Sequence, residues 1–406
     1  MKILIVEETD WLLKGPHNHH HFTEKLSLRG HDVRVMDFNL LWRTDGSKGL
    51  WIKKQYRENV AKLYEGARVS WVRPGIIRLP VLDYISHIFS SRREIFRQIK
   101  EYRPDIIIGF SILNTHLASR AARQHNIPFV YYWIDVVHAL IPFKPFHAIG
   151  KLVEKMTFRQ GKVIGFATNK KLRDYIKSLG AAETHIVRFG IDFTKFKHDI
   201  DTAQVRQTYG IEDSDIVLTF VGFYYGRLAN VCGLKELALG LKDVRNPHLK
   251  LMIIGEGTLD DELREIQRKY NLEGRLILTG KRPYQEIPAL LKVSSICLLS
   301  FRRTGLTEEI VPLKIFDYMA MGKPVISVRL PGMVDEFGED AGIVYVDKPE
   351  DIYDKAEALI RDGKLTELGA RSRQFIAGRS WDNVAEQIEG MLDDLIRKRK
   401  ETAVSG

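Results

Sequence analysis

The segment Glu309-Ile-Val-Pro-Leu-Lys-Ile-Phe-Asp317-Tyr-Met-Ala-Met-Gly322-Lys-Pro324-Val-Ile carries the most specific pattern in this chain of 406 residues. It predicts a helix over 312–321 that opens with Pro312, then a Gly-Lys-Pro turn, then a buried strand. Glu309 precedes the helix and Asp317 lies eight residues later, so at about 1.5 Å per residue the acids stand about 12 Å apart along its axis. That separation suits an extended ligand with polar groups at both ends. The alternative is an amphipathic helix with two solvated acids.

Twelve apolar segments alternate with helical segments along the chain. The apolar segments lie at 2–7, 33–38, 105–110, 127–134, 163–168, 185–189, 216–222, 250–255, 275–279, 295–300, 324–328 and 342–346. Helices are expected at 17–29, 115–125, 170–179, 233–243, 259–270, 285–293, 312–321 and from Ser380-Trp381 to about 399. Continuous apolar strands separated by helices predict parallel sheets covered on both faces. Two such blocks predict an α/β fold of two doubly wound, Rossmann-like domains.

The domain boundaries follow from this alternation. We expect a first domain at 1–195, a second at 196–379, and a final helix with a tail at 380–406. The polar stretch 192–215 contains no strand and is interpreted as the linker, and the tail 400–406 is expected to be disordered.

Composition predicts a cytoplasmic α/β enzyme. Hydrophobic residues make up 44% of the chain and charged residues 28%, as in soluble globular proteins. The two cysteines, Cys232 and Cys297, have no metal-ligand spacing and form no disulfide framework, which indicates a reducing compartment. The opening Met-Lys-Ile-Leu-Ile-Val-Glu reaches an acid too soon for a signal peptide, and no apolar run is long enough to span a bilayer.

Positive charge is concentrated in the first half. Residues 1–200 contain 33 basic and 19 acidic residues, a net charge of +14, and the remainder carries −4. Within 43–104, 14 basic and 6 acidic residues are mixed with aromatic and aliphatic ones, most densely at 71–89. This mixture suits an anionic membrane surface or a lipid-phosphate ligand. A solvated basic face is the alternative, and nucleic acid is disfavoured because no nucleic-acid motif accompanies the charge.

The acid-x7-acid spacing, the Pro-x-Lys helix start and the Met-Ala-Met-Gly-Lys-Pro exit resemble the signature of the retaining glycosyltransferases of family 4 (glycosyl transferases group 1), which have the GT-B fold. The resemblance implies two Rossmann-like domains facing across a cleft, with a C-terminal helix that crosses back to the first domain. It implies transfer of a sugar from a UDP- or GDP-linked donor, which is a substrate, with no metal and no further cofactor. In this family the first acid faces the donor sugar and the second grips the ribose. Those roles fall to Glu309 and to Asp317, where the family usually has Glu.

The resemblance also assigns residues to the donor phosphates. Free backbone N–H groups near Val311 to Lys314, where the helix opens, are expected to hold a phosphate, and the donor-binding segment is expected to include Ile310, Pro312 and Leu313 as well. After the strand at 216–222, the family has a Gly-Arg and then a lysine five residues beyond the Arg. Here the loop contains Gly222, Phe223 and Arg227, with Cys232 at the lysine position. Lys314 or Lys281 is a candidate to replace the missing cation, whereas Arg227 is alternatively a surface arginine in a turn.

Two more loops follow second-domain strands, where ligands of doubly wound sheets bind. Gly255-Glu-Gly257 makes a tight turn that lets the backbone approach a nucleotide, although such a pair is most often only a turn. The loop Gly280-Lys281-Arg282 contacts the base in the resembled family, largely through its backbone.

The first domain is expected to bind the acceptor. Gly15, before the helix at 17–29, matches a family glycine that touches the donor when the domains close. His17, His19, His20 and His21 lack the partners of a tetrahedral metal site, so no metal is predicted there. The family often has a catalytic His at position 110 and His-Asp at 134–135; this chain has Phe110 and Ile134-Asp135. Asp135 is carried over, and His116 and His138 are candidate substitutes that are alternatively structural.

The pairs Asp199-x-Asp201 and Asp213-x-Asp215 resemble the metal-binding motif of the other major glycosyltransferase fold, but they precede a strand and are interpreted as turn residues. We therefore expect a retaining, metal-independent glycosyltransferase that is cytoplasmic or peripheral on the membrane. Its expected acceptor is a lipid-linked or membrane-associated glycan. The alternatives are a GT-B sugar-nucleotide epimerase and a catalytically weak nucleotide-sugar-binding protein.

Overall fold

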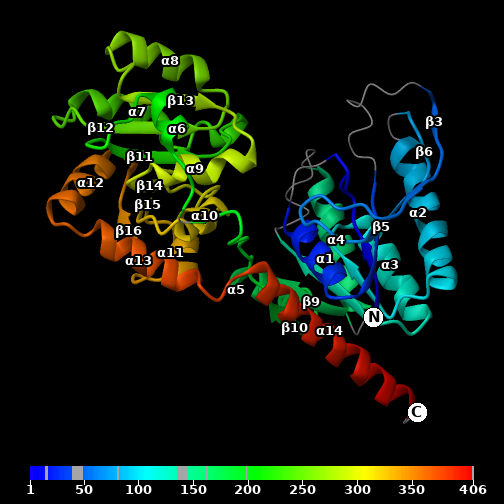
Figure 1. Cartoon of the computed structure of the whole chain (residues 1–406). Helices are drawn as coiled ribbons and strands as arrows, with labels where there is room; N and C mark the ends of the chain where they lie inside the picture. Colours follow the sequence, from blue (N-terminus) through cyan, green and yellow to red (C-terminus); the bar gives the residue numbers. More distant parts are fainter. Residues whose placement is uncertain are drawn as a thin grey trace. The chain divides into compact units, whose positions relative to one another are not determined.

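The computed structural model describes residues 1–13, 17–38, 49–79, 82–134, 145–160, 163–197 and 199–404. The chain forms two compact units (Figure 1): unit 1 comprises Met1–Gly190 and Trp381–Gly406, and unit 2 comprises Ile191–Ser380. The predicted linker at 192–215 is wrong, because these residues belong to unit 2. Ile191 pairs with Ser380 in a β-bridge, Phe196 is buried, and α6 (Ala203–Tyr209) forms in the polar stretch.

Unit 1 is built on an eight-stranded sheet. Its strand order is β10 (Glu183–Ile186), β9 (Val163–Ala167), β8 (Phe129–Trp133), β7 (Ile106–Gly109), β1 (Lys2–Val6), β2 (Asp32–Met36), β5 (Val69–Arg73) and β4 (Gln55–Arg57). All neighbours are parallel except β4, which runs antiparallel to β5. The short strands β3 (Trp51–Ile52) and β6 (Ile76–Ile77) pair separately. The strand order reverses between β1 and β7, which places a ligand-binding switch point at their carboxyl ends.

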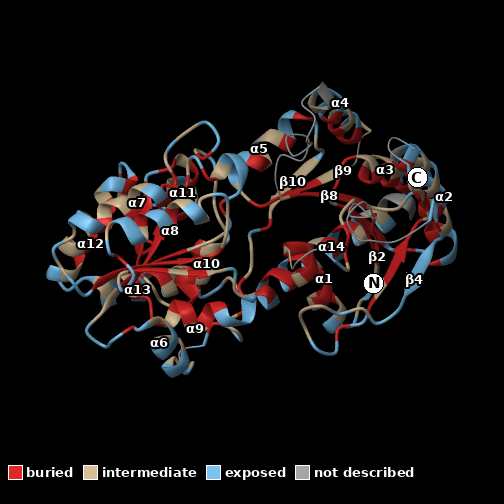
Figure 2. Cartoon of the chain, turned by 90° about the horizontal axis from the view of Figure 1, so that it is seen from above, coloured by how far each residue is buried: buried red, intermediate tan, exposed pale blue. Residues whose placement is uncertain are grey.

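Alternate residues of each unit 1 strand face opposite layers of helices. Ile3 and Ile5 pack with α1 (Asn18–Leu28) and α14 (Trp381–Val404) on one face. Leu4 and Val6 pack on the other face with residues of α2 (Leu82–Glu101), α3 (Leu113–Gln124), α4 (Pro145–Arg159) and α5 (Lys170–Ser178). Because both faces are covered, the central strands β1, β7 and β8 are apolar and buried, whereas the edge strand β4 is exposed (Figure 2).

The final helix completes unit 1. The buried residues of α14 recur at helical spacing and join the core of α1 and the sheet: Trp381, Val384, Ile388, Leu392 and Leu395. The predicted return of the C-terminal helix to the first domain is therefore confirmed. The prediction of a disordered tail from residue 400 is wrong for 400–404, because α14 continues to Val404.

Unit 2 has a six-stranded sheet in which all neighbouring strands are parallel. The strand order is β13 (Leu276–Gly280), β12 (Leu249–Ile254), β11 (Ile216–Val221), β14 (Ile296–Leu299), β15 (Val325–Val328) and β16 (Ile343–Val346). Its helices are α6, α7 (Leu234–Gly240), α8 (Asp260–Lys269), α9 (Ile287–Lys292), α10 (Lys314–Ala320), α11 (Pro331–Phe337), α12 (Ile352–Arg361) and α13 (Leu365–Ile376). Here the order reverses between β11 and β14. The predicted fold of two Rossmann-like domains is confirmed.

Within the described residues, no helix combines the length and the apolar character needed to cross a bilayer.

Candidate active site

Three glycine turns meet at the carboxyl ends of β11, β12 and β13. The N–H of Gly222 donates to the carbonyl of Ile254 at 2.9 Å, and the N–H of Gly255 donates to the carbonyl of Gly280 at 3.0 Å. Gly255 has φ +142°, and a Cβ atom there would collide with the carbonyl oxygen of Gly222. Only glycine therefore allows these loops to approach so closely. The sequence-predicted residues of the three loops are thus brought together beside the switch point of unit 2.

Gly257 ties two of these loops together. A Cβ atom at Gly257 would collide with the backbone of Tyr224, which accepts a hydrogen bond from the N–H of Thr258 at 3.1 Å. The hydroxyl of Tyr224 donates to the Asp260 carboxylate at 2.6 Å. Gly257 therefore has a packing role that accounts for its presence without a nucleotide.

Exposed aromatic and basic side chains surround the glycine turns. Phe223 and Tyr225 are about half exposed, and their rings stack at 6.3 Å between centroids. Arg227 is exposed in the 3₁₀ turn Gly226–Leu228, and the Lys281 Nζ lies 5.8 Å from the Phe223 ring centroid. Arg282 instead lies 3.8 Å from Glu286. Arg227 and Lys281 are thus the predicted cations that face solvent near this edge.

Lys314 lies beneath the Gly222 turn. Its Nζ atom is 3.6 Å from the Phe220 ring centroid, 4.9 Å from that of Phe301, and 3.1 Å from the position that a Cβ atom on Gly222 would take. Burial lowers the pKa of Lys314 to about 7 because the charged form loses water contacts. Among the described residues, no carboxylate forms an ion pair with it.

Cys232, at the position of the family lysine, is fully buried. Its Sγ atom donates to the carbonyl of Ala229 at 3.3 Å, and its own carbonyl accepts from the hydroxyl of Ser300 at 2.6 Å. Burial raises the pKa of this thiol. Cys232 therefore holds the β11 loop against the end of β14 and supplies no positive charge.

Asp317 projects from α10 toward Tyr284. The Tyr284 hydroxyl donates to the Asp317 carboxylate at 3.4 Å, and the Tyr284 ring meets Phe196 edge-on at 6.2 Å between centroids. Burial raises the pKa of Asp317 to about 7, since the charged carboxylate is removed from water. The sequence pattern assigned no role to Tyr284. Its partner lies 33 residues away, so no local pattern could have identified it.

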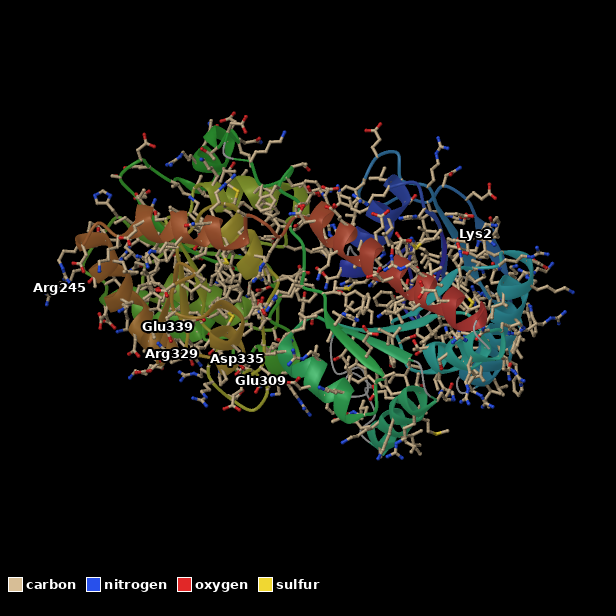
Figure 3. All side chains as sticks on the ribbon, turned by 90° about the horizontal axis from the view of Figure 1, so that it is seen from below. Lys2, Arg245, Glu309, Arg329, Asp335 and Glu339 are labelled. Atoms are coloured by element: carbon tan, nitrogen blue, oxygen red, sulfur yellow. The ribbon has the colours of Figure 1, made fainter. Side chains whose placement is uncertain are left out.

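Glu309 is exposed on a loop that packs against the start of α11. The N–H of Gly332 donates to the carbonyl of Glu308 at 2.8 Å, and a Cβ atom at Gly332 would lie only 2.7 Å from the carbonyl carbon of Glu309. Figure 3 shows Glu309 in this region together with Arg329 and Asp335. The glycine thus lets α11 fix the loop that carries the first acid.

The helix that follows Glu309 begins later than predicted. It runs over Lys314–Ala320 and not 312–321. The N–H groups of Ile315 and Phe316 donate to the carbonyls of Pro312 and Leu313, three residues back, at 3.1 and 3.0 Å. These bonds have 3₁₀ spacing, so Pro312 and Leu313 precede the regular helix. The expected 12 Å separation along one helix axis therefore does not apply to Glu309.

In unit 1 the predicted residues are only partly described. Gly15, Asp135 and His138 lie outside the described residues. His116 lies on α3, with its Nδ1 atom 2.9 Å from the Thr157 hydroxyl of α4, and burial lowers its pKa. Its ring therefore contacts the neighbouring helix within one layer of unit 1.

The histidine cluster organises the start of α1. The N–H of His17 donates to Nδ1 of His20 at 3.2 Å, and Nε2 of His20 lies 3.1 Å from the carbonyl of Trp11. Burial lowers the pKa of His20 to about 3, so the ring is neutral. His19 packs 5.6 Å from the Phe110 ring, with its Nε2 3.1 Å from the Glu7 carboxylate. An imidazole thus lies beside the position where the resembled family has its histidine.

The aspartate pairs have local partners. Asp201 accepts from the N–H of Ala203 at 2.9 Å at the start of α6, and Asp215 lies 2.7 Å from Nζ of Lys250. No group of three or more histidine, cysteine, aspartate or glutamate residues among those described is arranged to hold a metal ion.

Comparison with solved structures agrees with this architecture. The Anabaena protein HepE, solved in complex with UDP, aligns with 97% of this chain and 100% of its own at a TM-score of 0.70 and 16% identity. A sucrose-phosphate synthase from Thermosynechococcus elongatus aligns with 98% of this chain and 99% of its own at a TM-score of 0.68 and 15% identity. At these identities the likeness shows the fold, which is GT-B.

Two family models match the sequence. The model described as Glycosyltransferase Family 4 matches residues 20–195, and the model described as Glycosyl transferases group 1 matches residues 217–362. The chain therefore has the GT-B fold, and each of its two halves matches a model that describes glycosyltransferases.

Individual relatives are distant. An α-D-kanosaminyltransferase from Streptomyces kanamyceticus is 24% identical over 61% of this chain and 64% of its own. One subunit of the phosphatidylinositol N-acetylglucosaminyltransferase from Arabidopsis thaliana is 21% identical over 62% of this chain and 56% of its own. The chain thus spans less than two thirds of the length of these curated relatives. The comparisons give no support to the epimerase alternative.

Proposed function

We propose that this protein is a retaining, metal-independent glycosyltransferase that moves a sugar from a UDP- or GDP-linked donor to a lipid-linked or membrane-associated glycan. The observation that carries the donor assignment is the position of Lys314. The Lys314 amine is half-buried and lies directly under the Gly222 turn, at the switch point of unit 2. Among the described residues it has no carboxylate partner. An anionic ligand above that turn would supply the missing counter-charge.

The donor is proposed to span the carboxyl ends of β11 to β14. Asp317 accepts hydrogen bonds from the ribose hydroxyls, with Tyr284 holding its carboxylate in place. The diphosphate lies over Gly222, where Lys314 and the exposed Arg227 stabilise the charge that develops as the sugar leaves. In this arrangement Lys314 replaces the cation that is missing at Cys232. Backbone at 222, 255 and 280 can approach the nucleotide because these positions are glycines.

Glu309 is proposed to bind the hydroxyls of the donor sugar. Its loop is fixed by Gly332, and its side chain is exposed. Gly15 and Asp135 are retained as proposals for the first domain on the family resemblance, and His138 and His116 as candidate substitutes for the family's histidines. HepE was solved with UDP, and the Streptomyces relative is named a kanosaminyltransferase; both names agree with a nucleotide-linked sugar donor.

The acceptor proposal rests on charge. The excess of basic residues is confined to residues 1–200, which carry a net charge of +14, and such a surface attracts anionic lipids. We therefore propose a peripheral location on the cytoplasmic face of a membrane.

A thermal-shift screen against UDP-, GDP- and ADP-sugars tests the donor assignment. The correct donor should raise the melting temperature, since a ligand that binds only the folded state stabilises it. Incubation of that donor with a lipid-linked acceptor should then give a product whose anomeric configuration, read by NMR, matches the donor. No stabilisation by any nucleotide-sugar would contradict the donor site, and an inverted product would contradict retention.

A further inference from the structure

The helices α2, α3 and α4 form one layer of unit 1, and their outer surface is basic. They pack on the face of the sheet opposite to α1 and α14, as Figure 2 shows. Together they contain nine lysines and arginines and four acids. Three of the acids are buried, Asp83, Glu94 and Glu154, which leaves Glu101 as the exposed carboxylate of these helices. Positive charge therefore dominates this surface.

The same surface carries two exposed apolar stripes. On α2 the stripe is Leu82, Ile85 and Phe89, of which Phe89 is 68% exposed. On α4 it is Ile149, Leu152 and Met156, of which Leu152 is 56% exposed. Each stripe has the spacing i, i+3, i+7, so its members share one face of the helix. The opposite sides of these helices already fill the core through residues such as Ile95 and Phe158. Outer apolar stripes are thus not needed for folding and indicate an interaction surface.

A groove between α2 and α3 joins the apolar and basic features. It has a volume of about 180 Å³, and its apolar lining includes Ile88, Phe96 and Leu117. Arg92 and Arg120 line the same groove, and neither forms an ion pair with a carboxylate among the described residues. The Arg92 guanidinium lies 5.9 Å from the Phe96 ring centroid. Two available cations above an apolar slot suit a phosphodiester headgroup attached to an aliphatic chain.

We propose that this docking face, the outer surface of α2, α3 and α4, binds an anionic phospholipid bilayer. Phe89 and Leu152 enter the interface with the other members of their stripes, while Arg92 and Arg120 hold a lipid phosphate. A bilayer fits better than a protein partner because α2 and α4 each combine an apolar stripe with basic flanks. Helices that lie on anionic membranes have this composition. This proposal rests on the proposed function for one point only, the reason for docking. Docking would bring the enzyme to its membrane-bound acceptor.

The structure relocates the membrane-binding residues expected from the sequence. Within the predicted segment 71–89, Trp71 and Ile76 are buried in unit 1 and are unavailable to lipid. The exposed apolar residues begin at Leu79 and continue along α2, and α4 adds a second stripe that the sequence did not indicate. Both apolar stripes of the docking face therefore lie on helices, α2 and α4, that the sequence did not predict.

Co-sedimentation with vesicles tests the docking face. The full chain is mixed with vesicles of phosphatidylcholine alone or with phosphatidylglycerol, at low and at high salt. Wild type should bind the anionic vesicles at low salt and be released at high salt. The variant Arg92→Gln/Arg120→Gln should bind anionic vesicles about 30-fold more weakly, from about fivefold for each charge removed near the surface. Phe89→Ser/Leu152→Ser should also weaken binding, because the apolar contribution is lost.

The matched control is Arg245→Gln/Arg268→Gln, which removes the same charge from exposed positions of unit 2. It should bind like wild type, and equal loss in this control would overturn the docking face in favour of nonspecific attraction. Recovery of wild type in the supernatant under all conditions would also overturn it. A third outcome would overturn it as well: the wild type is a dimer, does not bind vesicles, and becomes a monomer in the Phe89→Ser/Leu152→Ser variant. The docking face would then bind a second copy of the chain. Thermal shifts with nucleotide-sugars, measured on every variant, keep this result separate from the donor assignment.

Discussion

The side chain of Lys314 allows the sharpest test of the donor site, beginning with stability. Burial lowers its pKa from 10.5 to about 7, which corresponds to about 5 kcal/mol at about 1.4 kcal/mol per unit. Because the folded pKa is the lower one, the charge destabilises the fold fully below pH 7 and progressively less up to about pH 10.5. Lys314→Met, which keeps the length without the charge, should therefore raise the free energy of unfolding of the ligand-free protein. Urea denaturation at several pH values should show the largest gain below pH 7, by up to several kcal/mol.

Nucleotide-sugar binding should change in the opposite direction. A diphosphate over Gly222 needs the protonated amine, so binding takes up a proton and affinity should fall about tenfold per unit above pH 7. Lys314→Met should bind the donor about 10- to 100-fold more weakly at pH 6.5, as expected for a charged hydrogen bond of about 1.5–3 kcal/mol. Calorimetric titration with the nucleotide-sugar, from acid to alkaline pH, measures both effects.

Lys314→Arg is the control, since a guanidinium keeps its charge throughout this range. It should retain affinity at pH 6.5 and lose the alkaline decline. Wild-type affinity that does not change with pH, or a Met variant that binds as tightly as wild type, would refute the role of Lys314 and leave Arg227 as the diphosphate cation. A Met variant less stable than wild type below pH 7 would refute the burial argument itself.

Three further predictions concern the rest of the donor site. Glu309→Ala should abolish most turnover with nucleotide affinity preserved, whereas Asp317→Ala should weaken nucleotide binding by about 1.5–3 kcal/mol; wild-type transfer rates in both variants would contradict the assignment of the two acids. EDTA should leave transfer intact, and an obligate requirement for Mg²⁺ or Mn²⁺ would contradict the proposed use of Arg227 and Lys314. Gly255→Ala should destabilise unit 2 by about 1–3 kcal/mol in thermal or urea unfolding, because its Cβ would collide with the carbonyl of Gly222 at a strained φ; unchanged stability would show that the loops can separate without loss.

The predictability of the fold follows from burial. Most of the predicted strands lie in a sheet covered on both faces, so their sequences are largely apolar and easily recognised. The strand predicted at 185–189 instead forms at Glu183–Ile186, on the edge of the sheet, where its residues are only half-buried. The missed strands β3, β4 and β6 have only two or three residues each and lack such a signal. In β5 the apolar pattern is interrupted by Ser70 and ends at Arg73, which is buried because it lies 2.8 Å from Asp10 and also pairs with Asp37. A buried charge resembles a surface residue until its distant partner is known.

The candidate site also contains features that local sequence patterns reveal and contacts that they do not. The glycine turns and the acid pair could be proposed from the sequence because each depends on residues close together in the chain. The contacts of Lys314 with Phe220 and of Asp317 with Tyr284 join different strands and loops, so no local spacing reports them. The start of α10 was misplaced because Pro312 suits the first helical turn, while the observed 3₁₀ bonds delay the regular helix to Lys314.

The way the chain crosses between the units has a consequence for biosynthesis. Unit 2 is continuous from Ile191 to Ser380 and its ends meet in a β-bridge, so it can fold as soon as it leaves the ribosome. Unit 1 emerges earlier but lacks α14, the helix that covers one face of its sheet, until the last segment has been translated. During that interval the apolar surface beside α1 is open to chaperones and to aggregation. A chain truncated shortly after Ser380 would therefore have a finished second unit and an uncovered first one.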